Sequence, residues 1–238
     1  MKFAAPLIEG KLVQRYKRFF ADVVLPSGET VTAHCANSGS MLSVKEPGSR
    51  AWISPAANPE RRLKYTWELI EIGGAMVGIN TGHPNRVVAE AISAGEIPEL
   101  RGYASLKREQ KYGKNSRIDV LLEDPTRPPC YVEVKNVTMK RLPGPLAPAE
   151  FPDSVTERGA KHLREMSDMV AAGGRAVMFY FVQRTDARRF GVAADIDPAY
   201  AEALTAALKA GVEAVCYGCD VTPDGISIAR PLTLDLPS

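Results

Sequence analysis

Residues 130 to 137 (CYVEVKNV) read as a short apolar strand that carries two opposite charges, Glu133 and Lys135. Side chains alternate along a strand, so these two share one face while the valines beside them point the other way. The apolar run before this strand carries a lone acid, Asp119. In a hairpin that turns near Arg127, Asp119 would pair across from Lys135 or diagonally from Glu133. The pattern predicts three charges on one face of a sheet.

Asp119, Glu133 and Lys135 together would suit metal-dependent cleavage of a phosphodiester. The two carboxylates and the backbone carbonyl of Val134 are hard oxygen ligands, which Mg²⁺ (or Mn²⁺) accepts while it keeps several waters. The Lys135 ammonium could position an attacking water or offset charge on a phosphate. A satisfied ion pair at a sheet edge is the alternative, because a buried charge cluster rarely stabilises a fold more than apolar residues would.

A helix is expected over residues 85 to 96, where Val88 and Ile92 share an apolar face and Gly95 stands near the end. Glu90 sits at the edge of that face. If the helix packs on the sheet, it could direct Glu90 toward the same cation, as a fourth metal ligand and catalytic group. A solvated glutamate is the alternative, because glutamates are mostly exposed.

Basic side chains recur where they could contact a nucleic-acid backbone. Residues 15 to 20 (RYKRFF) interleave bases and aromatics, as single-strand-binding barrels do. A helix beginning near Ser154 projects several polar side chains from one face, and its N-terminus suits phosphate; an exposed helix face is the alternative. The candidate nucleic-acid contacts are Arg15, Lys17, Arg18, Lys107, Arg117, Arg158, Lys161, His162 and Gln183.

The first part of the chain, up to about residue 80, shows strand patterns only. Residues 19 to 35 predict a hairpin that turns at Pro26 to Gly28, and residues 67 to 80 predict another that turns at Gly73 and Gly74. With strands near residues 7 to 13 and 50 to 54, these supply the five or so strands that close a small barrel of the OB type.

The remainder alternates helix and strand, which predicts a mixed sheet flanked by helices. Strands are expected near 101–110, 117–123, 130–137, 176–182 and 213–221, with helices from about 154 to 172 and from Asp197 to Gly211. The first of these helices should bury Val155, Gly159, Leu163, Met166 and Val170. Strand, helix and strand over residues 130 to 183 predict a parallel crossover.

Composition limits the class of protein. The 238 residues are 45% hydrophobic with a net charge of +2, which is ordinary for a globular chain. Charge is uneven: residues 101 to 117 hold six bases and one acid, whereas residues 195 to 238 hold seven acids and two bases. No apolar run reaches membrane-spanning length and the N-terminus lacks signal-peptide features, so we expect a cytoplasmic protein without a membrane partner. The four cysteines lie mostly in apolar runs, which argues against disulfides.

The chain resembles the sugar fermentation stimulation protein A family over nearly its whole length. The matching stretches are residues 18–19 to 33–34, 37–41, 80–85, 90–92, 116–119, 133–138, 151–159, 161–163 and 183–184. The resemblance implies an OB-like, DNA-binding barrel over residues 1–82 and a domain similar to the restriction-endonuclease-like PD-(D/E)xK nucleases over residues 83–238. In that pattern Asp119, Glu133 and Lys135 fall on the motif, and Glu90 falls on the acid of the first helix.

We therefore expect a two-domain DNA-binding protein with a Mg²⁺-dependent deoxyribonuclease centre, linked through its family to the regulation of sugar-utilisation genes. A DNA-binding transcriptional regulator without turnover is the main alternative. An enzyme acting on a sugar phosphate is a third, although no phosphate-loop motif is present. The sequence leaves the oligomeric state open, with a homodimer as one option.

Overall fold

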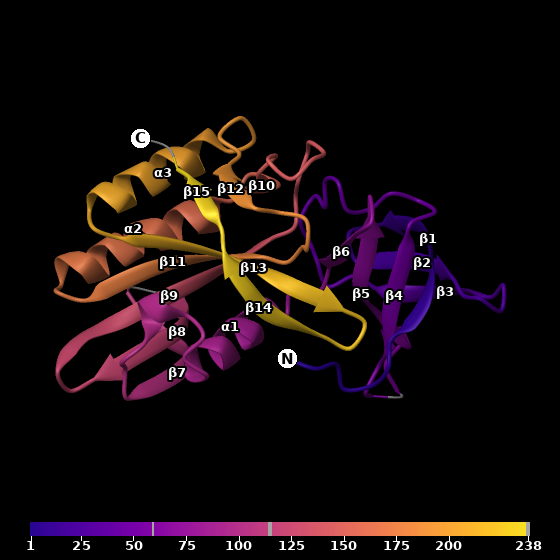
Figure 1. Ribbon diagram of the computed structural model, residues 1–238, viewed down its shortest axis with the longest axis horizontal. Coiled ribbons are helices and arrows are strands. Elements are labelled where there is room, and N and C mark those ends of the chain that lie inside the picture. Colours follow the sequence, from indigo (N-terminus) through magenta and orange to yellow (C-terminus); the bar gives the residue numbers. More distant parts are fainter. Residues whose placement is uncertain (59, 114–115, 237–238) are drawn as a thin grey trace.

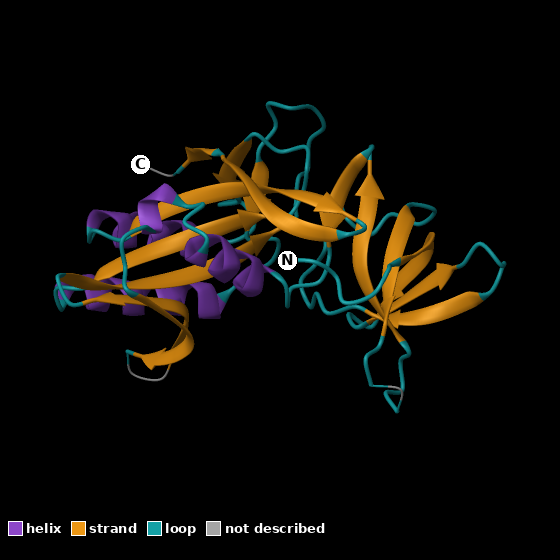
Figure 2. Cartoon of the chain, turned by 60° about the horizontal axis from the view of Figure 1, so that its bottom comes forward, coloured by secondary structure: helices purple, strands orange, loops and turns teal. Residues whose placement is uncertain are grey.

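The computed structural model describes residues 1–58, 60–113 and 116–236. Lys114, one of the six bases counted above between residues 101 and 117, lies outside these residues. The chain forms two parts that lie side by side, a strand-only part and a part with helices on both faces of a sheet (Figures 1 and 2). Among the described residues, no helix is long and apolar enough to span a membrane.

The first part is a closed barrel. Its strands are β1 (Ile8–Tyr16), β2 (Phe20–Val24), β3 (Thr30–His34), β4 (Arg50–Pro55), β5 (Tyr65–Ile72) and β6 (Ala75–Gly78). They follow the order β3-β2-β1-β4-β5-β6, and a parallel pairing of β3 with β5 closes the first five. Alternate side chains, such as Leu12, Val23 and Trp67, fill the interior. The predicted five-stranded barrel is confirmed, and β5 and β6 form the hairpin expected over residues 67 to 80.

The second part is built on a six-stranded mixed sheet of order β14-β13-β11-β9-β8-β7. Its strands are β7 (Ser105–Tyr112), β8 (Ser116–Asp124), β9 (Arg127–Val137), β11 (Arg175–Val182), β13 (Glu213–Thr222) and β14 (Gly225–Pro231). Strands β9, β11 and β13 run parallel, whereas the outer pairings are antiparallel. The predicted parallel crossover between the strands at 130–137 and 176–182 is confirmed.

Among the residues that the structure describes, three helices cover this sheet, and η1 (Pro98–Leu100) follows the first of them. They are α1 (Pro84–Ser93), α2 (Glu157–Ala171) and α3 (Pro198–Lys209). The central strand β11 is buried on both faces: Phe179 packs in a core with α1, and Tyr180 packs in a second core with α2 and α3. Figure 1 shows α2 and α3 side by side on one face.

The start of α2 differs from the prediction. Thr156 is the N-cap, because its hydroxyl accepts a hydrogen bond from the Gly159 N–H, so the helix begins beyond Ser154. Val155 therefore lies before the helix and its side chain is 71% exposed, so its expected place in the core is wrong. At α3, Asp197 caps the first turn through the N–H of Tyr200, close to the predicted start.

A small parallel sheet was missed by the sequence analysis. It consists of β10 (Ala149–Phe151), β12 (Arg189–Val192) and β15 (Thr233–Asp235), in the order β10-β12-β15. Each strand is only three or four residues long, too short for a period of two to show in the sequence. It extends the layer beside α3, and its central Phe190 is buried in the core of that face.

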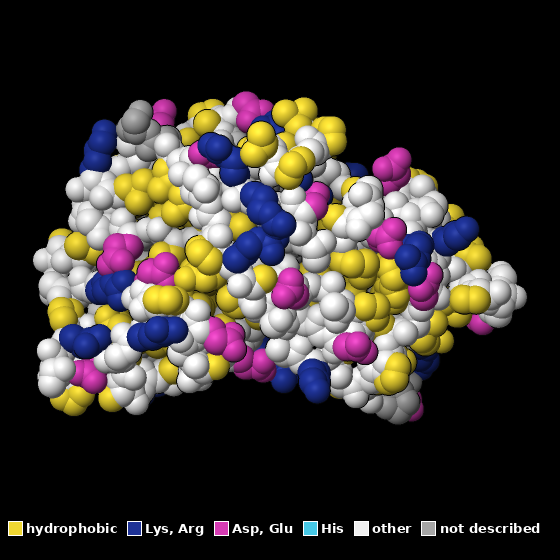
Figure 3. Space-filling model, viewed as in Figure 1, with side chains coloured by type: hydrophobic (Ala, Val, Ile, Leu, Met, Phe, Trp, Pro, Cys, Tyr) yellow, Lys and Arg dark blue, Asp and Glu magenta, His cyan; other side chains and the backbone are white. Residues whose placement is uncertain are grey.

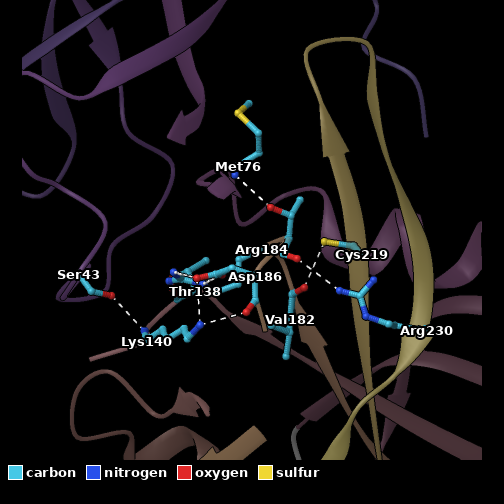
Figure 4. A network of polar contacts seen from close by, with 10 residues as sticks. Ser43, Met76, Thr138, Lys140, Val182, Arg184, Asp186, Cys219 and Arg230 are labelled. Atoms are coloured by element: carbon cyan, nitrogen blue, oxygen red, sulfur yellow. Dashed lines mark hydrogen bonds and ion pairs between the residues drawn. The ribbon is translucent and has the colours of Figure 1, made fainter. Parts of the chain in front are cut away.

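The two parts join through backbone pairing and a polar network (Figure 4). Met76 of β6 exchanges hydrogen bonds with Thr185, and the N–H of Gly78 donates to the carbonyl of Gln183. The Ser43 hydroxyl, from a barrel loop, accepts the N–H of Lys140. Since Gln183 and Thr185 directly follow β11, the barrel is anchored to the strand at the centre of the second sheet.

The N-terminus also crosses between the two parts. Residues 1–3 run beside the β13–β14 turn, where Lys2 forms a bridge with Gly225 and the Met1 ammonium donates to the Ile226 carbonyl. The first residues thus pack on the second part although they precede the barrel in sequence. All four cysteines are free and buried, so each serves as a small apolar residue of the core.

Candidate metal centre and nucleic-acid interface

Strands β8 and β9 separate at Asp119. The ladder pairs Val120 with Val132 and Leu121 with Tyr131, a register that places Asp119 level with Glu133. The Asp119 carboxylate lies in the gap that opens there: Oδ2 accepts the N–H of Val134 at 2.7 Å. The predicted proximity of Asp119 to the charged strand is therefore present, with Asp119 opposite Glu133, two residues away from the predicted pairing with Lys135.

The second oxygen of Asp119 is held by a residue that the sequence analysis missed. Asn85, in the first turn of α1, donates through Nδ2 to Asp119 Oδ1 at 2.6 Å. Pro84 at the first helical position starts α1 and so fixes where Asn85 points. An amide just inside a helix start carries no distinctive sequence signal, because its partner is 34 residues away.

Glu133 is buried, with 3% of its surface exposed, on the face of the sheet covered by α2. Its Oε1 accepts a hydrogen bond from Lys135 Nζ at 2.7 Å and contacts His162 Nδ1. Its Oε2 is buried and finds no hydrogen-bond partner among residues 1–58, 60–113 and 116–236. A buried carboxylate oxygen without a partner is costly, so its position calls for a cation or a water.

His162 and Arg158 fix the orientation of Glu133. Arg158 Nε donates to His162 Nε2 at 3.3 Å, and a guanidinium can only donate. The imidazole must therefore accept at Nε2 and carry its proton on Nδ1, which faces Glu133. His162 is 3% exposed, so its predicted role as a nucleic-acid contact is corrected: its ring contacts Glu133 and holds that carboxylate in place.

The two carboxylates have pKa values shifted in opposite directions. Burial and the neighbouring charge of Glu133 raise the pKa of Asp119 to about 6, against weaker hydrogen bonds from Val134 and Asn85. Burial also disfavours the charged form of Glu133, but the hydrogen bond of His162, together with the charge and hydrogen bond of Lys135, outweighs it and lowers the pKa of that group. Repulsion between two nearby acids is what a divalent cation relieves.

Two further buried oxygens lie in the same electrostatic environment. Tyr112 Oη and Glu165 Oε2 are buried and have no hydrogen-bond partner in the part of the chain that the structure describes. Burial, followed by the charges of Glu133, Glu165 and Asp119, raises the pKa of Tyr112. Glu165 lies 3.7 Å from Lys161 through its other oxygen. Tyr112 is the last residue of β7, an exposed and charged strand, and nothing in the neighbouring sequence indicated that it would lie near the candidate site.

Glu90 is not brought to this centre. Its carboxylate forms ion pairs with the Met1 ammonium at 3.0 Å and with Arg86 at 2.7 Å. On α1 it lies five residues beyond Asn85, which turns it to a different side of the helix. The sequence expectation of a metal-binding and catalytic role for Glu90 is therefore corrected: this acid anchors the N-terminus.

Gln183 is also placed away from any surface. Its side chain is 0% exposed and donates to the Gly78 carbonyl and to Asn136 Oδ1, each at 3.1 Å. Gly78 leaves room for it, since a Cβ there would lie 2.3 Å from Gln183 Cδ. The predicted nucleic-acid contact is corrected, because Gln183 joins the two parts of the molecule.

The remaining basic residues that were predicted to contact nucleic acid fall into two groups, those with a partner within the fold and those with exposed side chains. Arg15 donates to the carbonyls of Asn37 and Gly39, so it holds a barrel loop. Lys107 forms an ion pair with Glu123 at 2.7 Å. The other candidates, which have exposed side chains, are Lys17, Arg18, Arg117, Arg158 and Lys161.

Charge is mixed on the face of the molecule shown in Figure 3. Lys and Arg side chains alternate with Asp and Glu over most of it, with one compact basic group near the middle. Several of the acids in the last part of the chain pair with arginines, as Asp195 does with Arg141 and Asp235 with Arg189. The acidic tail is therefore partly neutralised within the fold.

The donor set at Asp119 and Glu133 fits a hard cation that keeps most of its waters. Within the described ranges, no three His, Cys, Asp or Glu side chains converge as a ready metal cage. Mg²⁺ does not need one, because it commonly binds one or two carboxylates. The N–H of Val134 points at Asp119, and the C=O of a strand residue points to the same side as its N–H, so this carbonyl faces the same gap.

Comparison with known proteins identifies the family. Residues 13–79 match the family model described as SfsA N-terminal OB domain, and residues 82–225 match that described as Sugar fermentation stimulation protein RE domain. Sugar fermentation stimulation protein homologs of Rhodospirillum rubrum and Rhodospirillum centenum are 61% and 62% identical, with 98% or more of each chain covered. The solved structure of Pyrococcus furiosus SfsA in complex with Ca²⁺ is 26% identical, with a TM-score of 0.87, over 99% of this chain and 98% of that one. These matches confirm the predicted fold class, and the chain belongs to the sugar fermentation stimulation protein family.

Proposed function

We propose that this protein binds DNA and that Asp119, Glu133 and Lys135 form a Mg²⁺- or Mn²⁺-dependent centre that hydrolyses phosphodiesters. The observation that carries the proposal is a buried carboxylate, Glu133, beside the half-buried Asp119 and one ammonium, with no partner for Glu133 Oε2 within the described residues. The related structure that contains Ca²⁺ supports a cation with the same preference for oxygen ligands.

Each group has a distinct role in this proposal. Asp119, Glu133 and the Val134 carbonyl would hold the cation, which when bound would polarise the phosphate and acidify a water. Lys135 would position the attacking water or offset the charge that develops on the phosphate. His162 would keep Glu133 oriented so that one oxygen stays directed away from the ion pair.

DNA contact is assigned to exposed bases on both parts of the molecule. Lys17 and Arg18 lie in the β1–β2 turn of a barrel of the OB type, a fold whose loops commonly bind oligonucleotides. Arg158 and Lys161 are exposed on α2, the helix whose His162 contacts Glu133. Contacts of this kind neutralise phosphates and make affinity depend steeply on salt. A cytoplasmic location, a link to sugar-utilisation genes and the oligomeric state stay predictions.

A DNA-binding regulator without turnover is the second candidate. It is favoured by the 2.7 Å ion pair between Lys135 and Glu133, which already satisfies one carboxylate oxygen, and by the two hydrogen bonds that hold Asp119. Such contacts would be enough for a purely structural cluster.

Cleavage of supercoiled plasmid DNA distinguishes the two candidates. In Mg²⁺ or Mn²⁺, the wild-type protein should nick the plasmid, and Glu133→Gln and Lys135→Ala should abolish nicking while DNA affinity stays within about twofold. Glu123→Gln is the matched control, because Glu123 also pairs with a lysine at 2.7 Å but on the exposed edge of the sheet. Tight binding without nicking in either metal would favour the regulator, and absence of binding would reject both candidates.

A further inference from the structure

Three aromatic side chains stand in register on the outside of the barrel. Tyr16 of β1 pairs with Phe20 of β2, and Phe20 pairs with His34 of β3. The ring centroids of Tyr16 and Phe20 are 5.4 Å apart with an angle of 17° between the planes. Ala21 and Ala33, the next residues on β2 and β3, are fully buried. Since strand side chains alternate, the rings lie on the outer surface, where they are half-buried.

A cavity of about 590 Å³ opens beside this row of rings. Its lining residues are Phe20, His34, Ala36, Arg61, Arg62, Leu63, Thr66 and Asn80. The volume falls in the range of roughly 300 to 1,000 Å³ that is typical of ligand sites. The lining combines rings, two arginines and two neutral hydrogen-bonding groups, and it includes no acid.

The arginines come from the connection between β4 and β5. Arg61 is held in place by a hydrogen bond of 3.0 Å from Nη1 to Thr66 Oγ1. Thr66 is in turn the neighbour of His34 across the β3–β5 pairing that closes the barrel. The fold therefore places a fixed cation at the end of the row Tyr16, Phe20 and His34, where a strand passing over the rings would carry its phosphate.

We propose that this surface, the aromatic groove, binds an unpaired segment of DNA. Bases would stack at Phe20 and His34, with Tyr16 supporting Phe20, and phosphates would lie on Arg61 and Arg62. This assignment rests on the proposed DNA binding and specifies in addition that the bound DNA is single-stranded. In a duplex the faces of the bases are already stacked on one another, so a row of rings has nothing to contact.

A sugar chain is the other ligand that barrels of this type accept, and it too can stack on aromatic rings. The pair of arginines and the absence of acids from the cavity lining favour a polyanion over a neutral sugar. A single strand of DNA satisfies both features of the groove, because each nucleotide brings one aromatic face and one negative charge.

Fluorescence anisotropy with a labelled oligothymidylate of about twelve nucleotides, and with a blunt duplex of equal length, tests the assignment. Stacking of one base on an aromatic ring typically changes affinity by about five- to a hundredfold. Phe20→Leu should therefore weaken oligothymidylate binding at least about fivefold, and Phe20→Tyr should restore it, with duplex binding unchanged in both. Arg62→Gln should also weaken single-strand binding, whereas the control Arg50→Gln, an exposed arginine of β4, should not.

The outcomes separate this proposal from the proposed function. If Phe20→Leu and Arg62→Gln both bind oligothymidylate as tightly as the wild-type protein does, the proposed role of the aromatic groove is overturned while DNA binding remains intact. Binding of neither oligonucleotide by the wild-type protein would overturn DNA binding itself. Arg62 is exposed, so Arg62→Gln gives an answer even if Phe20→Leu fails to fold.

Discussion

Lys135 Nζ lies 2.7 Å from one carboxylate oxygen of Glu133, while the other oxygen is buried without a partner in the described part of the chain. Glu133 and Lys135 are two residues apart on the same face of the strand. Lys135 therefore neutralises only one of the two carboxylate oxygens of Glu133. Asp119, which lies level with Glu133 where β8 and β9 separate, adds a second carboxylate. This asymmetry distinguishes the cluster from an ordinary surface ion pair.

Divalent cations should stabilise the folded protein through this gap. A ligand that binds only the native state adds about 2.7 kcal/mol to the free energy of unfolding when present at a hundred times its Kd. Added Mg²⁺ or Mn²⁺ should raise the Tm of the wild-type protein and of Glu123→Gln, but not that of Glu133→Gln, as measured by scanning calorimetry. An equal rise in all three would place the cation elsewhere.

His162 and Lys161 should have separable effects although they are adjacent on α2. His162→Ala removes the support of Glu133 and should lower the rate of plasmid nicking at least about tenfold, with DNA affinity unchanged. Lys161→Ala removes an exposed charge and should weaken binding while reducing the slope of log affinity against log salt by about one. Parallel rate and anisotropy measurements check both. A loss of affinity in His162→Ala would instead mean that its ring contacts DNA.

Stability should depend on pH through Glu68, which lies outside the proposed centre. Burial disfavours its charged form, but hydrogen bonds from His83, Ser54 and Asn80 outweigh it and hold the pKa below its ordinary value of 4.5. Its contribution is therefore present above pH 4.5 and is lost as the pH falls through the lowered pKa.

Glu68→Gln should accordingly lower the free energy of unfolding by about 1 to 3 kcal/mol at pH 7, and the difference from wild type should shrink at low pH. Urea titrations across the acid range measure this difference. Glu9→Gln, at an exposed ion pair with Arg50, should change stability by less than about 1 kcal/mol. A difference for Glu68→Gln that stays constant with pH would show that its charge is irrelevant.

The junction between the two parts should be sensitive to a single methyl group. Gly78→Ala places a Cβ 2.3 Å from the buried end of Gln183, and this overpacking should cost about 1 to 3 kcal/mol in unfolding free energy. Gly191→Ala is the matched control on β12, since its Cβ would meet Pro148 at an ordinary 3.5 Å. Denaturant unfolding of both variants tests the claim, and equal stability would mean that the junction yields easily.

Local patterns in the sequence were enough to place the three central charges together. Alternation along the strand put Glu133 and Lys135 on one face, and the lone acid in the preceding apolar run marked Asp119. The register could not be obtained this way, because an irregularity between Leu122 and Asp124 shifts the pairing and brings Asp119 level with Glu133. A bulge leaves no clear trace in residue types.

Errors arose where a residue's partner is distant in sequence. Glu90 lies on the expected helix and carries the carboxylate that a metal site needs, but the N-terminal ammonium of Met1 lies beside it and forms an ion pair with it. Gln183 directly follows the buried strand β11 and was expected to contact nucleic acid, yet β6 of the barrel covers it. Asn85 and Tyr112 were missed for the same reason, since long-range packing alone gives them a role.

The most direct test of the central claim is the position of Mn²⁺ in crystals of the wild-type protein, located by anomalous scattering. The account predicts a peak between the carboxylates of Asp119 and Glu133, within coordination distance of the Val134 carbonyl and absent from crystals of Glu133→Gln. Crystals soaked at saturating Mn²⁺ with no density in this gap, or with the ion bound only at other acids, would contradict it.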